Sequence, residues 1–452
     1  MKVIVVGDGK VGRTIVGHIC NEGHEVIVID TNSNTIDEIV AQYDVIGLCG
    51  NGASYDILKE AQADKADLLI AVTSTDETNI LACLIAQKLG AKSTIARVRN
   101  VEYSNQTNIF RKDLGIAMTI NPEKESANEI MKIVNFPEAI KIDSFASGNV
   151  DLVEKYIPED SPLVGKSLAQ LYQKYQIKVL VCAVQRNDQV FIPSGNFTFE
   201  AKDKVHITAN SRDTLRQFFS KTGLLESKLK NVLIIGGSKI ALYLATDLLK
   251  SRFDVKIIEK DYERCLELSQ MLPNASIICG DGTDQNLLYE EGIKDTDAII
   301  SLTGSDENNI ILSMFANKVN IQKIVTKINK SSLVGIMESI SNASIIAPKD
   351  ITSSQIVSYV RAQNNVRGSN VKTLYKLVNG KVEALEFVAK EDSELINIPL
   401  KDLSLKSNIL IAAIIRNDEV IIPNGNDKIE KNDSVIVVTT NQYLDDLSEI
   451  LE

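Results

Sequence analysis

The sequence lacks any hydrophobic run of the length that crosses a membrane. No uninterrupted apolar stretch approaches the ~20 residues that a membrane-spanning helix requires. The first residues, MKVIVVGDG, have the pattern of a β-strand followed by a turn and do not resemble a signal peptide. We therefore expect a cytoplasmic chain that cannot itself conduct ions.

Cysteine is scarce, and its spacing does not fit a metal site. None of the six cysteines forms a CxxC pair, which argues against zinc and against a disulfide framework. We expect all six to be small core residues in a reducing compartment. They are Cys20, Cys49, Cys83, Cys182, Cys265 and Cys279.

Positive charge is also in deficit, with 49 Lys and Arg against 60 Asp and Glu, a net charge of −11. Such a field repels polyanions, and no local basic stripe offsets it, so we expect no nucleic-acid partner. Hydrophobic residues at 44% and charged residues at 24% are typical of globular proteins rather than disordered or fibrous ones. A length of 452 residues exceeds what one hydrophobic core supports, which predicts two to four domains.

The chain contains an internal duplication. Five blocks recur in the same order, offset by 229 residues up to position 259 and by 230 residues from position 278. One inserted residue explains the change of offset, so the two halves are tandem copies. The matched blocks are VIVVGDGKVG at 3–12 with VLIIGGSKIA at 232–241, Asp30 with Glu259, LCGNG at 48–52 with ICGDG at 278–282, TSTDETN at 73–79 with TGSDENN at 303–309, and AVQRNDQVFIPSGN at 183–196 with AIIRNDEVIIPNGN at 413–426.

Each copy begins with buried strands that alternate with amphipathic helices. In the first copy the strand-like runs are VIVVG, HEVIVID, LLIAVT and STIARV, and segments such as ETNILACLIAQKLG have helical periodicity. Near-continuous apolar strands between helices indicate a parallel sheet covered on both faces. The fold class is therefore α/β, with a duplicated, doubly wound Rossmann-like lobe.

A second, smaller domain is expected after each lobe. Polar connectors are predicted near 136–150 and 361–370, and the short strands beyond them are punctuated by Pro and Gly, which favours a small α+β domain. We expect lobes at 1–123 and 230–348, and small domains at 142–225 and 368–452.

The first loop of the first lobe has the spacing of a dinucleotide-binding fingerprint. It follows a predicted strand and precedes a predicted helix, so Gly7 permits a tight turn, Gly9 leaves room for a pyrophosphate and Gly12 allows close helix packing. The amides at the helix N-terminus then point at the phosphates. The loop consists of Gly7, Asp8, Gly9, Lys10, Val11 and Gly12.

Four further positions complete the predicted site. Asp30 lies 18 residues beyond Gly12, close to the spacing of an acid that binds ribose hydroxyls, and its charge disfavours a 2′-phosphate. NAD(H) or an adenine nucleotide such as ATP or ADP is therefore favoured over NADP. Thr73 and Ser74 follow a strand at the ligand-binding edge, and Arg97 is a candidate phosphate or nicotinamide contact, with an exposed structural role as the alternative.

The second copy departs from this fingerprint. Ser238 and Ala241 stand where the second and third glycines should be, and Lys327 replaces Arg97. Each added Cβ narrows the approach of phosphate or helix, so we expect weaker, altered or absent nucleotide binding there. The matching candidate residues are Gly236, Gly237, Ser238, Lys239, Ile240 and Glu259.

Over nearly the whole chain these motifs resemble the TrkA family of bacterial Trk-system potassium uptake proteins, built from tandem RCK (regulator of potassium conductance) domains. The motifs that carry the resemblance are GDGKVG, VIVID, AVTSTDETN and ARVR, with GGSKIA, IIE and LTGSDENN in the second half. SPLVGKSL at 161–168 and the RND-containing segments are similar to the RCK C-terminal lobe.

The resemblance implies a regulatory role. It implies a peripheral protein on the inner face of the membrane that assembles as a homo-oligomeric ring, by analogy a tetramer, beneath a potassium-translocating subunit of the TrkH or TrkG type. It also implies that nucleotide-dependent movement of the lobes gates that subunit. The residues from Gly7 to Val11, with Asp30, Thr73, Ser74 and Arg97, are then the first nucleotide site.

Two other function classes remain open from the residues alone. An NAD-dependent oxidoreductase needs an acid or base beside the nicotinamide, but His18, His24 and His206 each lack a histidine counterpart in the other repeat. No Cys/His, Ser/His or paired-carboxylate cluster is evident, so we expect a sensor and no enzyme. A scaffold that binds nucleotide only for stability is the third possibility.

Overall fold

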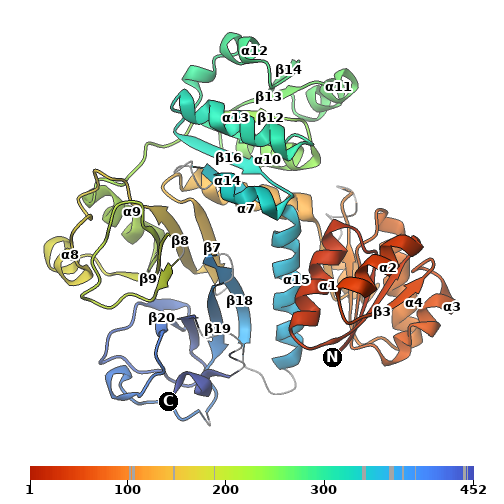
Figure 1. The fold of residues 1–452 in the computed structure, drawn as a ribbon, viewed down its shortest axis with the longest axis horizontal. Coiled ribbons are helices and arrows are strands. Elements are labelled where there is room, and N and C mark those ends of the chain that lie inside the picture. Colours follow the sequence, from red (N-terminus) through yellow and green to blue (C-terminus); the bar gives the residue numbers. More distant parts are fainter. Residues whose placement is uncertain are drawn as a thin grey trace. The chain divides into compact units, whose positions relative to one another are not determined.

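The computed structural model describes residues 1–100, 103, 107–145, 148–187, 189–337, 343–365, 371–378, 381–391, 393–440, 444 and 446–452. Their elements form four sheets in two compact units. One unit contains residues 1–128 together with 347–359, and the other contains residues 129–346 and 360–452. Figure 1 labels some of these elements along the chain.

The first lobe is a six-stranded parallel sheet in the order β3-β2-β1-β4-β5-β6. Val3 to Val6 are at most 1% exposed, since helices cover both faces of the central strands. Its strands are β1 (Lys2–Val6), β2 (Glu25–Asp30), β3 (Ile46–Cys49), β4 (Leu68–Ala71), β5 (Thr94–Arg97) and β6 (Met118–Ile120). Its helices are α1 (Lys10–Asn21), α2 (Ser33–Gln42), α3 (Tyr55–Glu60), the short η1 (Ala63–Lys65), α4 (Asp76–Leu89), α6 (Thr107–Lys112) and α7 (Pro122–Asn135).

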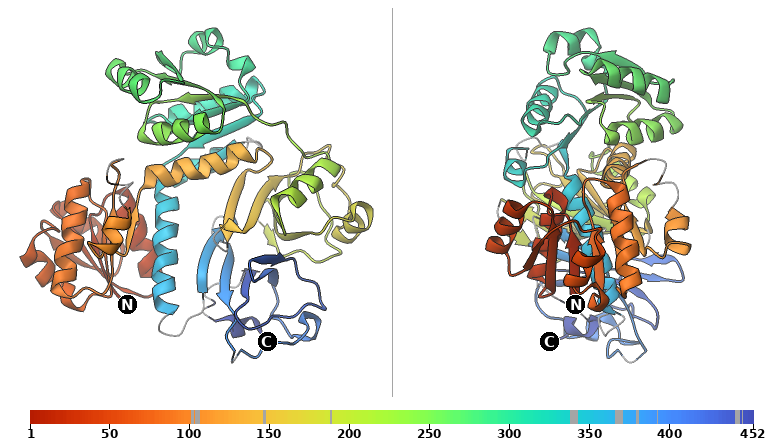
Figure 2. Two further views of the ribbon diagram at one scale, coloured as in Figure 1. Left: turned by 180° about the vertical axis from the view of Figure 1, so that it is seen from behind. Right: turned by 90° about the vertical axis from the view of Figure 1, so that its right-hand side faces the viewer.

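The second lobe repeats this topology as β14-β13-β12-β15-β16-β17, and Figure 2 shows helices on both faces of its sheet. The strands are β12 (Asn231–Ile235), β13 (Asp254–Glu259), β14 (Ser276–Cys279), β15 (Ala298–Ser301), β16 (Lys323–Lys327) and β17 (Ala343–Ile346). The helices are α10 (Lys239–Lys250), α11 (Tyr262–Met271), α12 (Gln285–Glu290), η3 (Ile293–Asp295), α13 (Asp306–Lys318), η4 (Ser331–Leu333), α14 (Val334–Met337) and α15 (Pro348–Asn365).

Each small domain is a five-stranded antiparallel sheet, ordered β10-β9-β11-β8-β7 and β18-β19-β22-β20-β21. The first contains β7 (Lys141–Phe145), β8 (Val150–Tyr156), α8 (Leu168–Tyr175), β9 (Val179–Arg186), β10 (Gln189–Phe191), β11 (Lys204–Ala209) and α9 (Arg212–Lys221). The second contains β18 (Val371–Leu377), β19 (Val382–Val388), η6 (Leu400–Asp402), β20 (Ile409–Arg416), β21 (Glu419–Ile421), β22 (Ser434–Thr439) and η7 (Leu447–Ile450). The predicted fold class, a duplicated Rossmann-like lobe followed each time by a small α+β domain, is confirmed.

The recurring RND motif has a structural role in both small domains. Arg186 pairs with the buried Asp203, its Nε lying 2.7 Å from Oδ1, and Arg416 pairs in the same way with the buried Asp433. A bidentate pair of this kind fixes the hairpin of each sheet. Asp188 of the first motif lies outside the described residues.

The two antiparallel sheets share one apolar core. Phe145, Leu152 and Ala183 of the first sheet belong to the same buried cluster as Ala384 and Ile436 of the second. The sheets lie side by side in Figure 2. Their pairing buries apolar faces that would otherwise be exposed to water.

The expectation of polar connectors is wrong where the structure describes them. Within 136–150, residues Lys141–Phe145 form the edge strand β7, which pairs with β8 and buries Ile142 and Phe145. Residues 361–365 continue helix α15, whereas 366–370 lie outside the described residues. Polar residues in these segments did not indicate connectors, because one face of a strand or one turn of a helix can be polar within a regular element.

A segment of the second half packs on the first lobe. Residues 347–359, at the start of α15, belong to the same compact unit as residues 1–128, and Figure 1 shows α15 beside α1. Ser353 Oγ lies 2.7 Å from His18 Nδ1, and Tyr359 Oη lies 2.7 Å from Ser93 Oγ. Chain order alone therefore does not define the packing units.

Within the described part of the chain, no helix combines the length and the apolar character needed to span a bilayer.

Candidate nucleotide-binding site

The glycine loop lies where the winding of the first sheet reverses. Strands β2 and β3 lie on one side of β1, and β4, β5 and β6 lie on the other. Gly7 follows β1, and Thr73 follows β4 after one intervening residue. Ligands of open α/β sheets bind at this carboxyl edge, at the point where strand order reverses.

The three glycines of the loop have different surroundings. Gly7 has φ of +99°, and a Cβ there would lie 2.9 Å from the Thr73 amide nitrogen. A Cβ on Gly12 would lie 1.9 Å from the Gly7 carbonyl oxygen. At Gly9, by contrast, a Cβ would meet no described atom within 4 Å. Gly7 and Gly12 are needed for packing, while the space beside Gly9 is open to a ligand.

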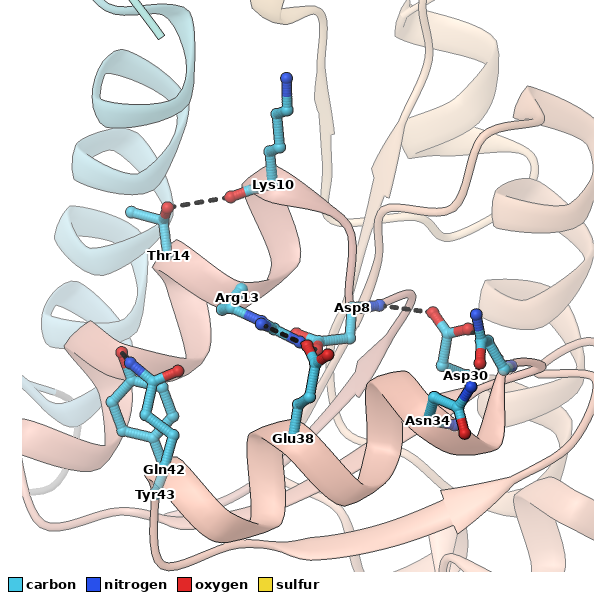
Figure 3. A network of polar contacts seen from close by, with 10 residues as sticks. Asp8, Lys10, Arg13, Thr14, Asp30, Asn34, Glu38, Gln42 and Tyr43 are labelled. Carbon is cyan, nitrogen blue, oxygen red and sulfur yellow. Dashed lines mark hydrogen bonds and ion pairs between the residues drawn. The ribbon is translucent and has the colours of Figure 1, made fainter. Parts of the chain in front are cut away.

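The amides at the start of α1 face this open space. Gly9 is the N-cap residue and provides no side-chain hydrogen bond to the helix. The helix therefore keeps unsatisfied N–H groups and the positive end of its dipole at the loop, an arrangement that suits a phosphate. Lys10 is exposed and points away from the polar network drawn in Figure 3.

Asp30 is held in place by the loop. Its Oδ2 accepts a hydrogen bond from the Asp8 amide at 2.8 Å, and its Oδ1 accepts one from the Asn32 amide at 2.9 Å. The residue is half-buried at the end of β2. Each carboxylate oxygen has a further lone pair, so ribose hydroxyls could still donate to it.

The Asp8 side chain points into the protein rather than toward a ligand. Asp8 is 4% exposed, and its Oδ2 lies 2.8 Å from Nη2 of Arg13. Arg13 also pairs through Nη1 with Glu38 at 3.0 Å (Figure 3). Burial raises the pKa of the Asp8 carboxyl, and Arg13 partly offsets that rise. The Asp8 side chain is therefore not placed to contact a nucleotide, whereas its backbone amide holds Asp30 in position.

An asparagine that sequence reasoning missed joins Thr73 to Arg97. The fully buried Asn79 accepts hydrogen bonds from the Thr73 amide at 2.8 Å and the Thr73 hydroxyl at 2.7 Å. Its Nδ2 donates to the Arg97 carbonyl at 2.9 Å. Asn309 makes the same contacts to Thr303 and Lys327 in the second lobe. The recurrence of TSTDETN as TGSDENN was the available signal for this clamp.

Arg97 carries a charge without a carboxylate partner in the described part of the chain. Its Nε is buried and has no hydrogen-bond acceptor there. Burial lowers the pKa of Arg97, and the neighbouring Arg99 lowers it further. A desolvated guanidinium is stabilised by an anion, so this position fits a phosphate group. Ser74 is exposed beside Thr73.

The second lobe keeps the turn but closes the helix N-terminus. Gly236 has φ of +98°, like Gly7. Ser238, in place of Gly9, caps α10 by accepting a hydrogen bond from the Ala241 amide at 3.4 Å. Glu259 accepts from the Gly237 amide at 2.6 Å, matching the contact of Asp30. The acid is therefore retained, while one amide that a phosphate would use has an internal partner.

Two positions near the second loop differ further. Gly237 replaces Asp8, and its carbonyl accepts a hydrogen bond from Nε of Arg264 at 2.7 Å. Lys327, which replaces Arg97, directs its ammonium to the Leu302 carbonyl at 3.4 Å. Lys239 and Ile240 begin helix α10. The charge distribution around the two loops is therefore unequal.

The histidines lie away from both loops. His18 is in the second half of α1, and His24 follows that helix, so both lie at the opposite edge of the sheet from Gly7. His206 is 2% exposed in β11, and burial lowers its pKa. None is placed to exchange a proton with a ligand at the glycine loop.

The expectation that all six cysteines are core residues is wrong for two of them. Cys49 and Cys279 are exposed at the ends of β3 and β14. Both end an outer strand of a lobe, where the sheet has a neighbour on one side only. Cys83, Cys182 and Cys265 are buried, as predicted.

These features define a class of tandem-repeat protein in which each Rossmann-like lobe is followed by a small antiparallel-sheet domain. The TrkA-N domain model matches residues 3–122 and 232–348, and the TrkA-C domain model matches residues 152–221 and 384–452. The chain belongs to the TrkA family of Trk system potassium uptake proteins. The predicted family resemblance is thus confirmed.

Curated relatives agree with this membership, and a solved structure has a similar fold. The chain is 32% identical to the Trk system potassium uptake protein TrkA of Vibrio alginolyticus, covering 100% of this chain and 99% of the relative. It is 31% identical to the TrkA homolog of Archaeoglobus fulgidus, covering 100% of both chains. Its fold is similar to the structure described as "GsuK channel bound to NAD", with a TM-score of 0.62 at 15% identity, covering 98% of this chain and 77% of that one.

Proposed function

We propose that this chain is a cytoplasmic, non-enzymatic regulatory subunit that binds NAD(H) or an adenine nucleotide in its first lobe. The observation that carries the proposal is the uncapped N-terminus of α1, with open space at Gly9 and the acid Asp30 held beside it. Gly7 to Gly12, Asp30, Thr73, Ser74 and Arg97 make up the proposed site. Gly236 to Ile240 and Glu259 make up a second, weaker one.

We further propose that nucleotide binding gates a separate potassium-translocating membrane subunit of the TrkH or TrkG type. Relatives over the whole length of the chain are named potassium uptake proteins. A peripheral position on the inner face of the membrane and a homotetramer fit this role. The functional domains are proposed at 1–123, 142–225, 230–348 and 368–452.

The geometry gives less support to an NAD-dependent oxidoreductase. Hydride transfer needs an acid or base near the nicotinamide, whereas His18, His24 and His206 all lie away from the loop. A sensor needs only a nucleotide affinity that differs between two conformations of the oligomer. Shifting the ratio of these conformations from 1:99 to 99:1 requires about 5.5 kcal/mol of binding free energy. Divided among four equivalent sites, this is about 1.4 kcal/mol per site, a roughly tenfold difference in affinity.

Flux measurement on the reconstituted complex tests the proposal. The chain and its membrane subunit are placed in vesicles, and potassium flux is recorded with NADH, NAD, ATP or ADP while nucleotide concentration is followed. We expect a nucleotide-dependent change of flux without consumption, and its loss in Asp30→Ala. Turnover of NADH would favour the oxidoreductase. An identical response of the parent and Asp30→Ala chains, or no response at all, would favour the scaffold.

A further inference from the structure

Two thiols lie together beside the acid of the second lobe. Cys265 is in the first turn of α11, and Cys279 is the last residue of β14. Glu259 ends the neighbouring strand β13 and is in register with Cys279. The Cys265 thiol donates a hydrogen bond to the Glu259 carbonyl at 3.2 Å, and the neighbouring Cys279 thiol is close enough to help raise the pKa of Cys265. The three residues therefore form one cluster.

The pair combines an accessible thiol with a buried one. Cys279 is exposed, whereas Cys265 is 7% exposed. An external oxidant can reach the Cys279 thiol. The Cys265 thiol, which lies beside it, can then react with the oxidised Cys279. This combination is typical of redox-sensitive pairs rather than of structural disulfides.

The first lobe has only half of this arrangement. Cys49 is exposed at the end of β3, in register with Asp30, as Cys279 is with Glu259. The position of Cys265, however, is taken by the buried Ile36 of α2. The duplicated chain therefore contains its own single-thiol comparison.

We propose that Cys265 and Cys279 are a redox modification site, at which a low-molecular-weight disulfide oxidises the two thiols to an intramolecular disulfide. The Cys279 thiolate attacks one sulfur of the reagent, forming a mixed disulfide and releasing one reagent thiolate. The Cys265 thiolate then attacks the Cys279 sulfur and releases the second. In total, two protein thiols become one disulfide, the reagent is reduced to two thiols, and both protons pass to water or to the released thiolates.

The second step is expected to be the slower one. Burial chiefly, and then the neighbouring Cys279 thiol, raises the pKa of the Cys265 thiol to about 11. At pH values below this pKa, the thiolate fraction of Cys265 therefore increases about tenfold for each unit by which the pH is raised. Closure of the disulfide should accelerate by the same factor.

The consequence for ligand binding rests on the proposed function. A disulfide draws the Cys265 sulfur away from the Glu259 carbonyl and removes that hydrogen bond. Since Glu259 is the acid that faces the second glycine loop, we expect the oxidised form to bind ADP about threefold to tenfold more weakly at this lobe.

Thiol mapping on the full-length chain tests the modification site. The reduced protein is incubated with 2-hydroxyethyl disulfide at mildly alkaline pH, alkylated under denaturing conditions and digested. We expect a peptide pair joined through Cys265 and Cys279 that separates on reduction. A stable reagent adduct on Cys279, with Cys265 still alkylated, would overturn the proposal.

Matched variants complete the test. Cys265→Ser should stop at the reagent adduct on Cys279, as Cys49 does in the parent chain, and Ile36→Cys should create a link to Cys49. ADP affinity is then compared between oxidised and reduced chains carrying Gly9→Val, which blocks the first lobe. If the reduced chain binds no ADP, nucleotide binding by the second lobe fails while the linked peptides still establish the disulfide.

Discussion

At the scale of single residues, a side chain at Gly9 is compatible with the fold but not with a bound nucleotide. Its backbone, with φ of −72° and ψ of −173°, is extended and open to any residue. Gly9→Val should therefore fold normally yet abolish NAD(H) binding at the first lobe, because the side chain fills the space for the pyrophosphate. Calorimetric titration and thermal melting measure the two effects.

Gly7→Val is the matched comparison. It places a β-branched residue at φ of +99° and against the Thr73 amide, so it should lower the free energy of unfolding by about 1–3 kcal/mol or more. If the Gly9→Val chain retains the NAD(H) affinity of the parent, the pyrophosphate does not bind beside this residue and the proposed site is wrong.

Asp30 gives a second prediction at the same scale. Asp30→Ala removes the acceptor for ribose hydroxyls, and we expect NAD(H) affinity to fall by about 1–3 kcal/mol, the effect of a lost hydrogen bond to a charged group. Titration calorimetry measures the loss. Glu259→Ala, the equivalent change in the second lobe, should leave the first-site affinity unaltered.

Because Asp30 also accepts the Asp8 amide, Asp30→Asn provides a control for loop structure. It keeps an acceptor oxygen while losing the charge. Affinity of Asp30→Ala equal to that of the parent would contradict the ribose assignment.

At the scale of elements, the N-termini of α1 and α10 distinguish the two lobes. The first has no side-chain cap, whereas Ser238 caps the second. Ser238→Gly frees the Ala241 amide at a cost of only a few tenths of a kcal/mol, since glycine is itself a tolerated cap residue. We expect ADP affinity of the second lobe to rise, measured by titration in the Gly9→Val chain.

Ser238→Asp is the opposing variant. It retains the cap and adds negative charge where a phosphate would lie, so ADP affinity should not rise. Equal affinities for the parent, Ser238→Gly and Ser238→Asp chains would show that the cap does not control the second lobe.

At the scale of the whole molecule, one buried lysine ties the second lobe to the first half of the chain. Lys323, 1% exposed at the start of β16, donates to the carbonyls of Pro137 and Ala139 just after α7. Burial lowers the pKa of Lys323 from 10.5 to about 8. The folded protein therefore holds the proton less tightly than the unfolded chain does.

The sign of the pH dependence follows. Between about pH 8 and 10.5 the unfolded chain binds more protons at this lysine, so its contribution to the free energy of unfolding increases with pH, by at most about 1.4 kcal/mol per unit. The free energy of unfolding is measured with denaturant for the parent and Lys323→Met chains across this pH range. The difference between the two free energies should be constant below pH 8 and should increase in favour of the parent above it. A difference that stays flat up to pH 10.5 would contradict the lowered pKa.

The sequence determined the repeated elements because its information is local. Apolar runs, helical periodicity and the spacing from Gly7 to Asp30 each depend on neighbours within about one βα unit. The duplication, both parallel sheets and the loop at their carboxyl edge could therefore be predicted. The same local signal could have identified Asn79, since its block recurs unchanged in position.

Only the tertiary structure decided which side chains meet across the chain. Asp8 turns inward because the Arg13 guanidinium compensates its charge, and residues 141–145, expected in a polar connector, form a strand because β8 supplies their hydrogen-bond partners. Residues 347–359 pack on the first lobe, and Cys265 and Cys279 both lie beside Glu259, through contacts that no single segment encodes. Such contacts depend on the balance of burial and pairing between distant segments, which residue patterns do not contain.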